Sequence, residues 1–248
     1  MSSNFSIPTE TVELPSKGLL YPKSSPLASG SIEMKYMTAK EEDILTNQNY
    51  IQKGIVVDKL LESLIVTKVD YNDILIGDKD ALLIASRILG YGKDYEFTYG
   101  GENIKVDLTT LENKELDSTL VKERKNEFTF KLPNTDNTIT FKLLNQRDEK
   151  DIKRELEGLR KISPNSSQEL STRMKYMILS VNGVSERPVV REFVDKAFLA
   201  KDARAFREHY GSVVPGINTT ISYEFEDGLE EELNIPINAN FLWPDFGV

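Results

Sequence analysis

A strictly alternating pattern around a double-glycine turn constrains the fold of this chain more than any other feature. Residues 95–99 (YEFTY) alternate apolar and polar side chains, the turn Gly100-Gly101 follows, and residues 104–108 (IKVDL) alternate again. A period of two places successive side chains on opposite faces of a strand, and paired glycines suit the positive φ angles of a tight turn. The sequence therefore predicts a β-hairpin here.

Two further hairpins are expected. Residues 128–132 and 139–143 alternate in the same way across a short polar loop. Near the end of the chain, Tyr223-Glu224-Phe225, an Asp227-Gly228 turn and Leu233-Asn234-Ile235 repeat the plan of the first hairpin. This repetition indicates either an old internal duplication or the general appearance of hairpins, and the few shared identities favour the second interpretation.

Helical spacing fills most of the remaining sequence. Thr38 and Glu41 form a capping-box pattern at the start of a short helix. Six further helices are expected, at residues 56–64, 81–89, 152–159, 170–181, from Pro188 onward, and 202–211. Asp78 is expected to cap the second of these, and Gly90 is expected to end it. We therefore expect an α+β fold with helices alternating with hairpins, allowing two similar helix-plus-hairpin lobes.

The N-terminal residues have a different character. Residues 1–30 contain Pro8, Pro15, Pro22 and Pro26 among serines and glycines, which excludes a regular helix or a central strand. We expect an extended arm whose apolar residues lie on the protein's own core or on a partner. The predicted organisation is this arm, a helical and hairpin lobe at 31–145, and a helical lobe at 146–248 that ends in a hairpin and an aromatic tail.

Composition excludes several functions. The 248 residues include no cysteine, so disulfides, thiolate metal sites and cysteine nucleophiles are absent. A net charge of −9 disfavours nucleic acid as the main partner. No stretch has the secretion-signal pattern or the ~20 apolar residues of a membrane helix, so we expect the protein to stay in the cytoplasm where it is made, away from membranes.

No catalytic pattern stands out. His209 is the single histidine and no Gly-x-Ser-x-Gly motif accompanies it, which disfavours a serine triad and zinc. Gly90-Tyr91-Gly92-Lys93-Asp94 lacks the first glycine and the Ser or Thr of a phosphate loop. The acidic run from Glu224 to Glu232 lacks the register of a calcium loop and indicates a solvated hairpin tip. We therefore expect a non-enzyme with no metal and no cofactor, although sequence leaves a fold-assembled carboxylate pair open.

Three strings resemble a known family. They are residues 14–22 (LPSKGLLYP), 37–46 (MTAKEEDILT) and 236–244 (PINANFLWP). In this order they resemble the baseplate hub assembly proteins of T4-type contractile-tailed bacteriophages, and residues 191–218 are also similar. The resemblance implies a role in assembling the baseplate hub by binding hub or tape-measure proteins, in the host cytoplasm and, for a retained subunit, in the virion tail. Relatives often carry cysteine pairs in the two Tyr-Glu-Phe hairpins, and this chain has none, so no metal is carried over.

Two alternatives remain open beside an assembly chaperone. One is a stable structural subunit of the baseplate, which differs from a chaperone only in its presence in the particle. The other, less favoured, is a hub-associated cell-wall hydrolase, because an acidic protein is poorly suited to an anionic cell wall. The sequence leaves the oligomeric state undecided.

Candidate partner-binding residues lie at both ends of the chain. They are Leu14, Pro15, Lys17 and Tyr21 in the first string, and Phe241, Leu242, Trp243 and Phe246 at the C-terminus. The C-terminal aromatics suit either a partner anchor or a plug in the protein's own core. We favour the plug, as a strand-like stretch that completes the last hairpin with Trp243 at its edge.

Overall fold

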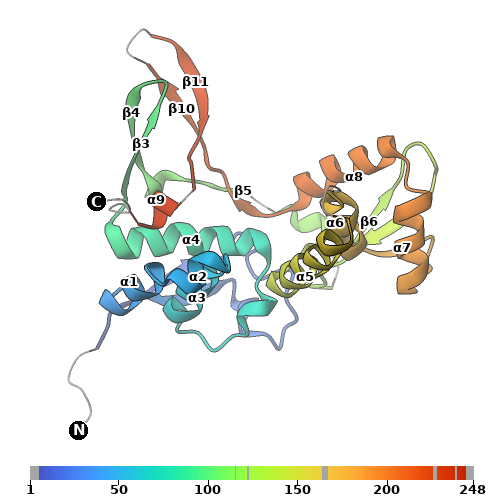
Figure 1. Ribbon diagram of the computed structural model, residues 1–248, viewed down its shortest axis with the longest axis horizontal. Helices are drawn as coiled ribbons and strands as arrows, with labels where there is room; N and C mark the ends of the chain where they lie inside the picture. The colour runs from blue at the N-terminus through green and yellow to red at the C-terminus, as the bar shows by residue number, and fades with distance from the viewer. Residues whose placement is uncertain are drawn as a thin grey trace.

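The protein consists of two lobes and a tower of two hairpins (Figure 1). A computed structural model describes residues 6–114, 116–121, 123–163, 167–225, 228–237 and 239–243. The first lobe holds the N-terminal helices, the tower rises beside the central helix α4, and the second lobe lies at the far end of the molecule (Figure 1). Small antiparallel sheets and helices coexist, which confirms the α+β class.

The first lobe is a helical layer with a two-stranded sheet. Its elements are β1 (Thr9–Glu13), β2 (Ser31–Lys35), α1 (Ala39–Leu45), α2 (Gln48–Gln52), α3 (Val56–Leu64), α4 (Ile76–Tyr91) and the late helix α9 (Ala239–Leu242), with short helical turns at Pro26–Ser29 and Tyr71–Asp73. Helices α1, α2 and α3 lie on one side of α4, and α9 lies on the other (Figure 1). The fully buried Leu60, Leu61, Leu64 and Leu82 form the centre of this lobe.

Helix α4 begins earlier and ends later than its sequence indicates. Its N-cap is Leu75 and its C-cap is Gly92, so Asp78 occupies the third helical position instead of the cap, and Gly90 lies inside the helix. A Cβ at position 90 would lie 2.6 Å from the Met37 sulfur, so Met37 can pack this closely on α4 because residue 90 has no side chain. The close packing of Met37 therefore explains this glycine better than helix termination does.

Residues 1–30 do not form an arm apart from the first lobe. Strand β1 pairs with β2 from Thr9↔Lys35 to Glu13↔Ser31, and the backbone that follows returns to the sheet through a bond from the Leu14 N–H to the Gly30 carbonyl at 2.8 Å. The prolines did exclude a central strand, but they leave room for this two-stranded sheet. Residues 1–5 lie outside the described residues.

The tower combines hairpins from distant parts of the chain. Strands β3 (Asp94–Tyr99) and β4 (Glu102–Asp107) form one hairpin, and β10 (Thr220–Glu224) and β11 (Glu230–Asn234) form the other. Gly100 and Gly101 have φ values of 59° and 94°, which confirms the expected tight turn. The two hairpins rise side by side (Figure 1).

The second lobe packs helices around a three-stranded sheet. Its elements are β6 (Phe128–Lys131), β7 (Thr138–Phe141), α5 (Gln146–Ile162), α6 (Glu169–Met177), β8 (Ile178–Val181), α7 (Arg187–Lys196) and α8 (Ala200–Val213). The sheet order β6-β7-β8 confirms the second hairpin but corrects the helix expected to run to Val181. It also places the hairpin of residues 128–141 in the second lobe, so the boundary expected at 145 falls inside this lobe.

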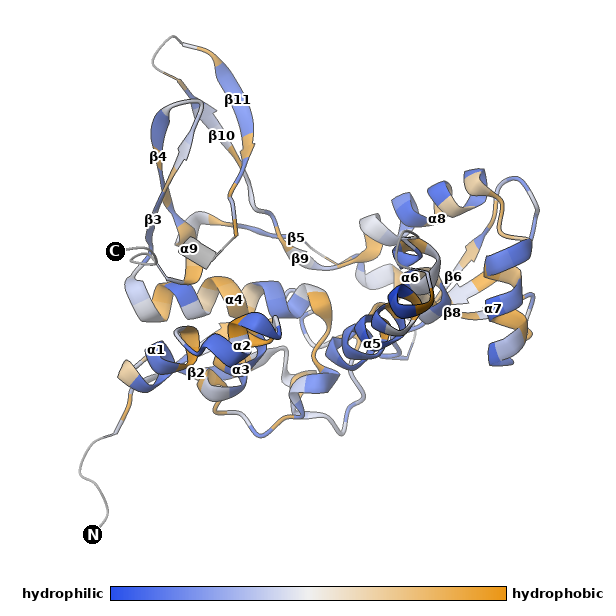
Figure 2. Cartoon of the chain, in the orientation of Figure 1, coloured by the Kyte–Doolittle hydropathy of each residue, from blue (hydrophilic) through white to orange (hydrophobic). Residues whose placement is uncertain are grey.

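A short stem joins the second lobe to the rest of the molecule. Strand β5 (Asn113–Lys114) pairs with β9 (Gly216–Ile217), so the chain enters and leaves the second lobe at neighbouring points. Two backbone hydrogen bonds of 3.0 Å also connect the lobes. They run from the Ile76 N–H to the Leu144 carbonyl and from the Gln146 N–H to the Ile74 carbonyl. Figure 2 shows that α5, near this junction, is largely hydrophilic.

Candidate functional site

The string at residues 14–22 forms a buried clamp on helix α4. The Asp78 carboxylate accepts hydrogen bonds from the Ser16 N–H at 2.8 Å, the Ser16 hydroxyl at 2.7 Å and the Tyr21 hydroxyl at 2.6 Å. The Tyr21 hydroxyl in turn accepts the Leu75 N–H at 2.9 Å, one of the amides at the helix start that lack a helical partner. The clamp therefore satisfies the beginning of α4 with side chains from distant sequence.

Burial sets the electrostatics of this clamp. Asp78 is fully buried, and burial raises the pKa of its carboxyl, while the hydrogen bonds from Tyr21 and Ser16 act in the opposite direction. Burial also raises the pKa of Tyr21, and the neighbouring Asp78 raises it further. Tyr21 thus stays a neutral donor, and the cluster is a structural contact without a free acid or base.

A backbone constraint explains the Lys-Gly pair within the string. Gly18 has φ +70°, and a Cβ there would lie 2.6 Å from the Gly30 nitrogen and 2.7 Å from the Ala28 carbonyl oxygen. The adjacent Lys17 also has a positive φ, 50°, and its side chain is exposed. The turn therefore brings the 14–22 string against the segment before β2, where only glycine fits at position 18.

The string at residues 37–46 forms a second anchor. Its expected capping box is present, and Glu41 accepts the Thr38 N–H at 3.0 Å. Lys35 and the Ser63 hydroxyl each donate to the Glu41 carboxylate at 2.7 Å. Burial acts to raise the pKa of Glu41, but the hydrogen bonds from Lys35, Thr38 and Ser63 outweigh burial and lower the pKa to about 2.

The C-terminal string plugs the protein's own core, but as a helix. Phe241 is 0% exposed, its ring meets that of Tyr95 edge-on at 4.9 Å, and Leu242 is also buried. The Tyr95 hydroxyl donates to the Pro236 carbonyl at 2.9 Å. Residues 239–242 form α9 and pack on α4, which corrects the expected strand, while Trp243 is half-buried at the edge of the core.

Most candidate partner-binding residues are therefore parts of the interior. Leu14, Pro15, Tyr21, Phe241 and Leu242 are buried. Lys17 and, in part, Trp243 reach the surface. Phe246 lies outside the described residues. The strings that carry the resemblance build the first lobe and offer little exposed surface.

Buried carboxylates in this fold share one structural position. Glu41, Asp78, Asp148 and Asp202 are the third helical residues of α1, α4, α5 and α8, and all four are buried. This position places negative charge at the positive end of the helix dipole. In α8, Asp202 accepts the Asn134 N–H at 2.9 Å and the Thr135 hydroxyl at 2.8 Å, tying the β6–β7 loop to the helix.

The remaining candidates for chemistry are also occupied by structural contacts. His209 stacks on Phe130 with ring centroids 4.4 Å apart, and burial lowers its pKa. A groove of about 530 Å³ beside the clamp contains Asp70 and Asp73, but Arg147 contacts their carboxylates at 3.0 Å and 3.1 Å. Within the described ranges, no three His, Cys, Asp or Glu side chains gather as a metal site.

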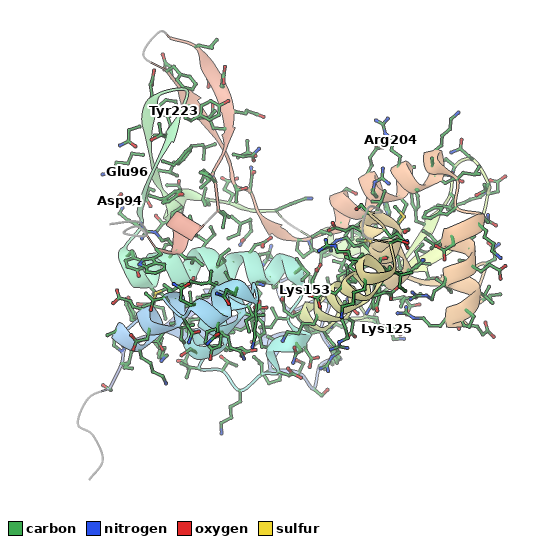
Figure 3. The ribbon with its side chains drawn as sticks, in the orientation of Figure 1. Asp94, Glu96, Lys125, Lys153, Arg204 and Tyr223 are labelled. Atoms are coloured by element: carbon green, nitrogen blue, oxygen red, sulfur yellow. The ribbon has the colours of Figure 1, made fainter. Side chains whose placement is uncertain are left out.

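The tower presents a different surface. On its inner side, Tyr95, Ile104, Val106, Leu233 and Ile235 are buried. At the tip, the rings of Tyr99 and Phe225 lie 6.2 Å apart. Tyr223 lies between the two hairpins, while Asp94 and Glu96 point away from the second hairpin (Figure 3).

The outer side of the tower is acidic. Register places Glu96 on the face opposite Tyr95 and Phe97, and places Glu224, Glu230 and Glu232 on the face opposite Tyr223. Residues 94–107 and 218–237 together contain ten acidic residues against one lysine, a net charge of −9 that equals the charge of the whole chain. The rest of the sequence is therefore balanced, and the acidic character is concentrated in the tower segments.

Sequence reasoning interpreted the acidic run only as a solvated tip. A stronger signal was available, because Arg207 is the last lysine or arginine of the chain. A stretch of such length without a cation, joined to apolar alternation, indicates a one-sided charged surface.

Comparison with known proteins does not identify the chain. No family model, curated protein or solved structure matches it. Among the described residues, no helix has the length and apolar character needed to cross a membrane.

Proposed function

We propose that the chain is a non-enzymatic assembly factor or component of the baseplate hub of a contractile-tailed bacteriophage. It would act by binding hub or tape-measure proteins. The proposal begins from the resemblance of the strings at residues 14–22, 37–46 and 236–244 to that family.

One observation supports treating these strings as a single signal. Tyr21 and Ser16 hold Asp78 at the start of α4, Met37 packs on Gly90 near its end, and α9 packs along it. Strings far apart in sequence that contact one helix specify one structural unit. Agreement in all three is thus a stronger argument for a shared fold than three separate short matches would be.

Co-expression with the neighbouring tail proteins tests the proposal. The tagged chain should retain a hub or tape-measure protein through affinity purification and gel filtration. Gly77→Ala controls for folding, because its added Cβ would lie 1.8 Å from the Pro215 carbonyl oxygen, so this variant should yield no soluble chain and no retained protein. If the folded chain retains neither protein, the proposal fails.

Mass spectrometry of purified virions then separates the two forms of the proposal. A stoichiometric presence indicates a structural subunit, and absence from the particle indicates a chaperone. Clearing of purified cell wall by the chain alone would contradict both and would support a hydrolase.

A further inference from the structure

We propose that the tower is the docking surface for an extended, lysine- and arginine-rich segment of a partner protein, which adds as a further strand to the free edge of β11. The inference rests on the proposed function only in assuming that the chain acts by binding proteins. It names the chemistry of the partner and the backbone groups that it contacts.

Strand β11 presents an open edge. Within the described part of the chain, β11 pairs only with β10, and Glu230, Glu231, Glu232 and Asn234 are exposed. Two backbone hydrogen bonds of 2.9 Å show which β11 residues pair with β10. They run from the Phe225 N–H to the Leu229 carbonyl and from the Ile235 N–H to the Thr219 carbonyl, so every second residue from Leu229 to Ile235 faces β10. The N–H and C=O groups of the residues between them, Glu230, Glu232 and Asn234, therefore point away from β10 toward the open edge. An open edge of this kind can accept another strand.

The negative charge of β11 selects the occupant of this edge. Proteins commonly protect edge strands with lysine, proline or a bulge, whereas β11 carries three consecutive glutamates. Two copies of this edge would repel each other, so a second copy is disfavoured. A basic strand would place its cations beside Glu230, Glu231 and Glu232, and the field of the acidic tower would speed its approach.

An apolar tip lies beside that edge. Leu229 is 53% exposed directly before β11, and Tyr99 is 46% exposed on the facing hairpin. Phe225 is half-buried, its ring lies 6.2 Å from the Tyr99 ring, and its N–H donates to the Leu229 carbonyl at 2.9 Å. Half-exposed aromatic and aliphatic side chains next to charged groups are typical of interface anchors. A bound strand would cover this tip while its backbone pairs with β11.

The test uses the full chain and a labelled probe peptide of alternating lysine and valine. Fluorescence anisotropy should show binding that weakens as salt rises. Two matched peptides separate charge attraction from strand pairing. One replaces lysine by glutamate and should not bind. The other carries N-methyl groups on every backbone amide and should bind about tenfold more weakly or worse, because neither of its edges can donate hydrogen bonds to a strand.

Matched variants locate the site. E230K/E231K/E232K should weaken binding of the lysine peptide by about tenfold or more. E112K/E127K/E157K changes the net charge equally at exposed glutamates outside the tower and should change affinity less than about twofold. Glu230→Gln with Glu232→Gln is the milder pair if the triple variant fails to fold. Hydrogen exchange of the Glu230, Glu232 and Asn234 amides should slow in the complex.

Several results would overturn the inference. Equal binding of the N-methylated peptide would show charge attraction without strand addition. Equal losses in the two triple variants would show that no particular site is used. If the protein forms dimers at high concentration and the β11 variants are monomeric under the same conditions, a second copy of the chain occupies the β11 edge. If the peptide binds as expected while the tail proteins are not retained, the phage proposal fails and the docking surface remains.

Discussion

Tyr21→Phe should destabilise the protein although it removes a single oxygen atom. That oxygen donates to Asp78 at 2.6 Å and accepts the Leu75 N–H at 2.9 Å, both in a buried site. Leaving the buried Leu75 N–H unsatisfied costs about 1–3 kcal/mol. Asp78 keeps its two hydrogen bonds from Ser16 but loses one bond to a charged group, which contributes about 1.5–3 kcal/mol, so the expected loss is about 3 kcal/mol in total. For a protein of this size, that corresponds to a fall in melting temperature of roughly 6–12 °C.

Urea unfolding followed by circular dichroism measures this loss, with Tyr36→Phe as the matched control. The Tyr36 hydroxyl donates to Glu10 at 3.0 Å, but this contact is exposed. Its removal should cost less than about 0.5 kcal/mol. A double-mutant cycle with Asp78→Asn should give a coupling energy of about 1–2 kcal/mol between Tyr21 and Asp78. If Tyr21→Phe and Tyr36→Phe lose the same stability, the clamp does not hold α4 and the reasoning is refuted.

Three further predictions follow from packing and charge. Gly77→Ala should abolish soluble expression because its added Cβ clashes with the Pro215 backbone. Gly158→Ala has nothing near the added Cβ and should raise the free energy of unfolding by about 0.5–1 kcal/mol. If the two variants behave alike in solubility and urea-unfolding assays, the packing described at Gly77 is wrong. Phe241→Ala should cost about 3–5 kcal/mol of unfolding free energy and Trp243→Ala clearly less, since only Phe241 is fully buried; calorimetry that ranks them in the opposite order would place the plug wrongly. Glu41→Gln should lower the free energy of unfolding at neutral pH. The gap in stability between this variant and the unaltered protein should shrink as pH falls from the ordinary glutamate pKa toward the folded value of about 2, because a lowered carboxyl pKa stabilises the folded state only above that range. A stability gap that stays the same in acid titrations would show that the Glu41 charge is not its cause.

Local signals were sufficient where a structure depends on neighbouring residues. The Gly100-Gly101 hairpin and the Thr38–Glu41 capping box were predicted correctly, because turn conformation and helix capping are decided within a few residues. The α+β class follows from the same local patterns. The helix expected to reach Val181 was wrong because residues 178–181 pair with β7, and a spacing of apolar residues cannot reveal a partner strand elsewhere in the chain.

The candidate site shows the limit of single-sequence reasoning. Leu14 and Tyr21 look like exposed anchors in a proline-rich segment, yet Leu14 is 1% exposed and Tyr21 contacts Asp78, 57 positions away. The identity of that partner depends on the tertiary fold. The acidity of the tower, in contrast, is present in composition, but its meaning depends on two hairpins from distant segments standing together.

The short β5–β9 stem connects these observations. The second lobe lies between the two hairpins in the sequence, and the stem brings its entry and exit together, so that β10 and β11 can stand beside β3 and β4. An isolated two-stranded hairpin is marginally stable in water, and each hairpin here covers the apolar face of the other. The two hairpins therefore stabilise each other as a pair, and the stem holds both of them at one place in the folded chain.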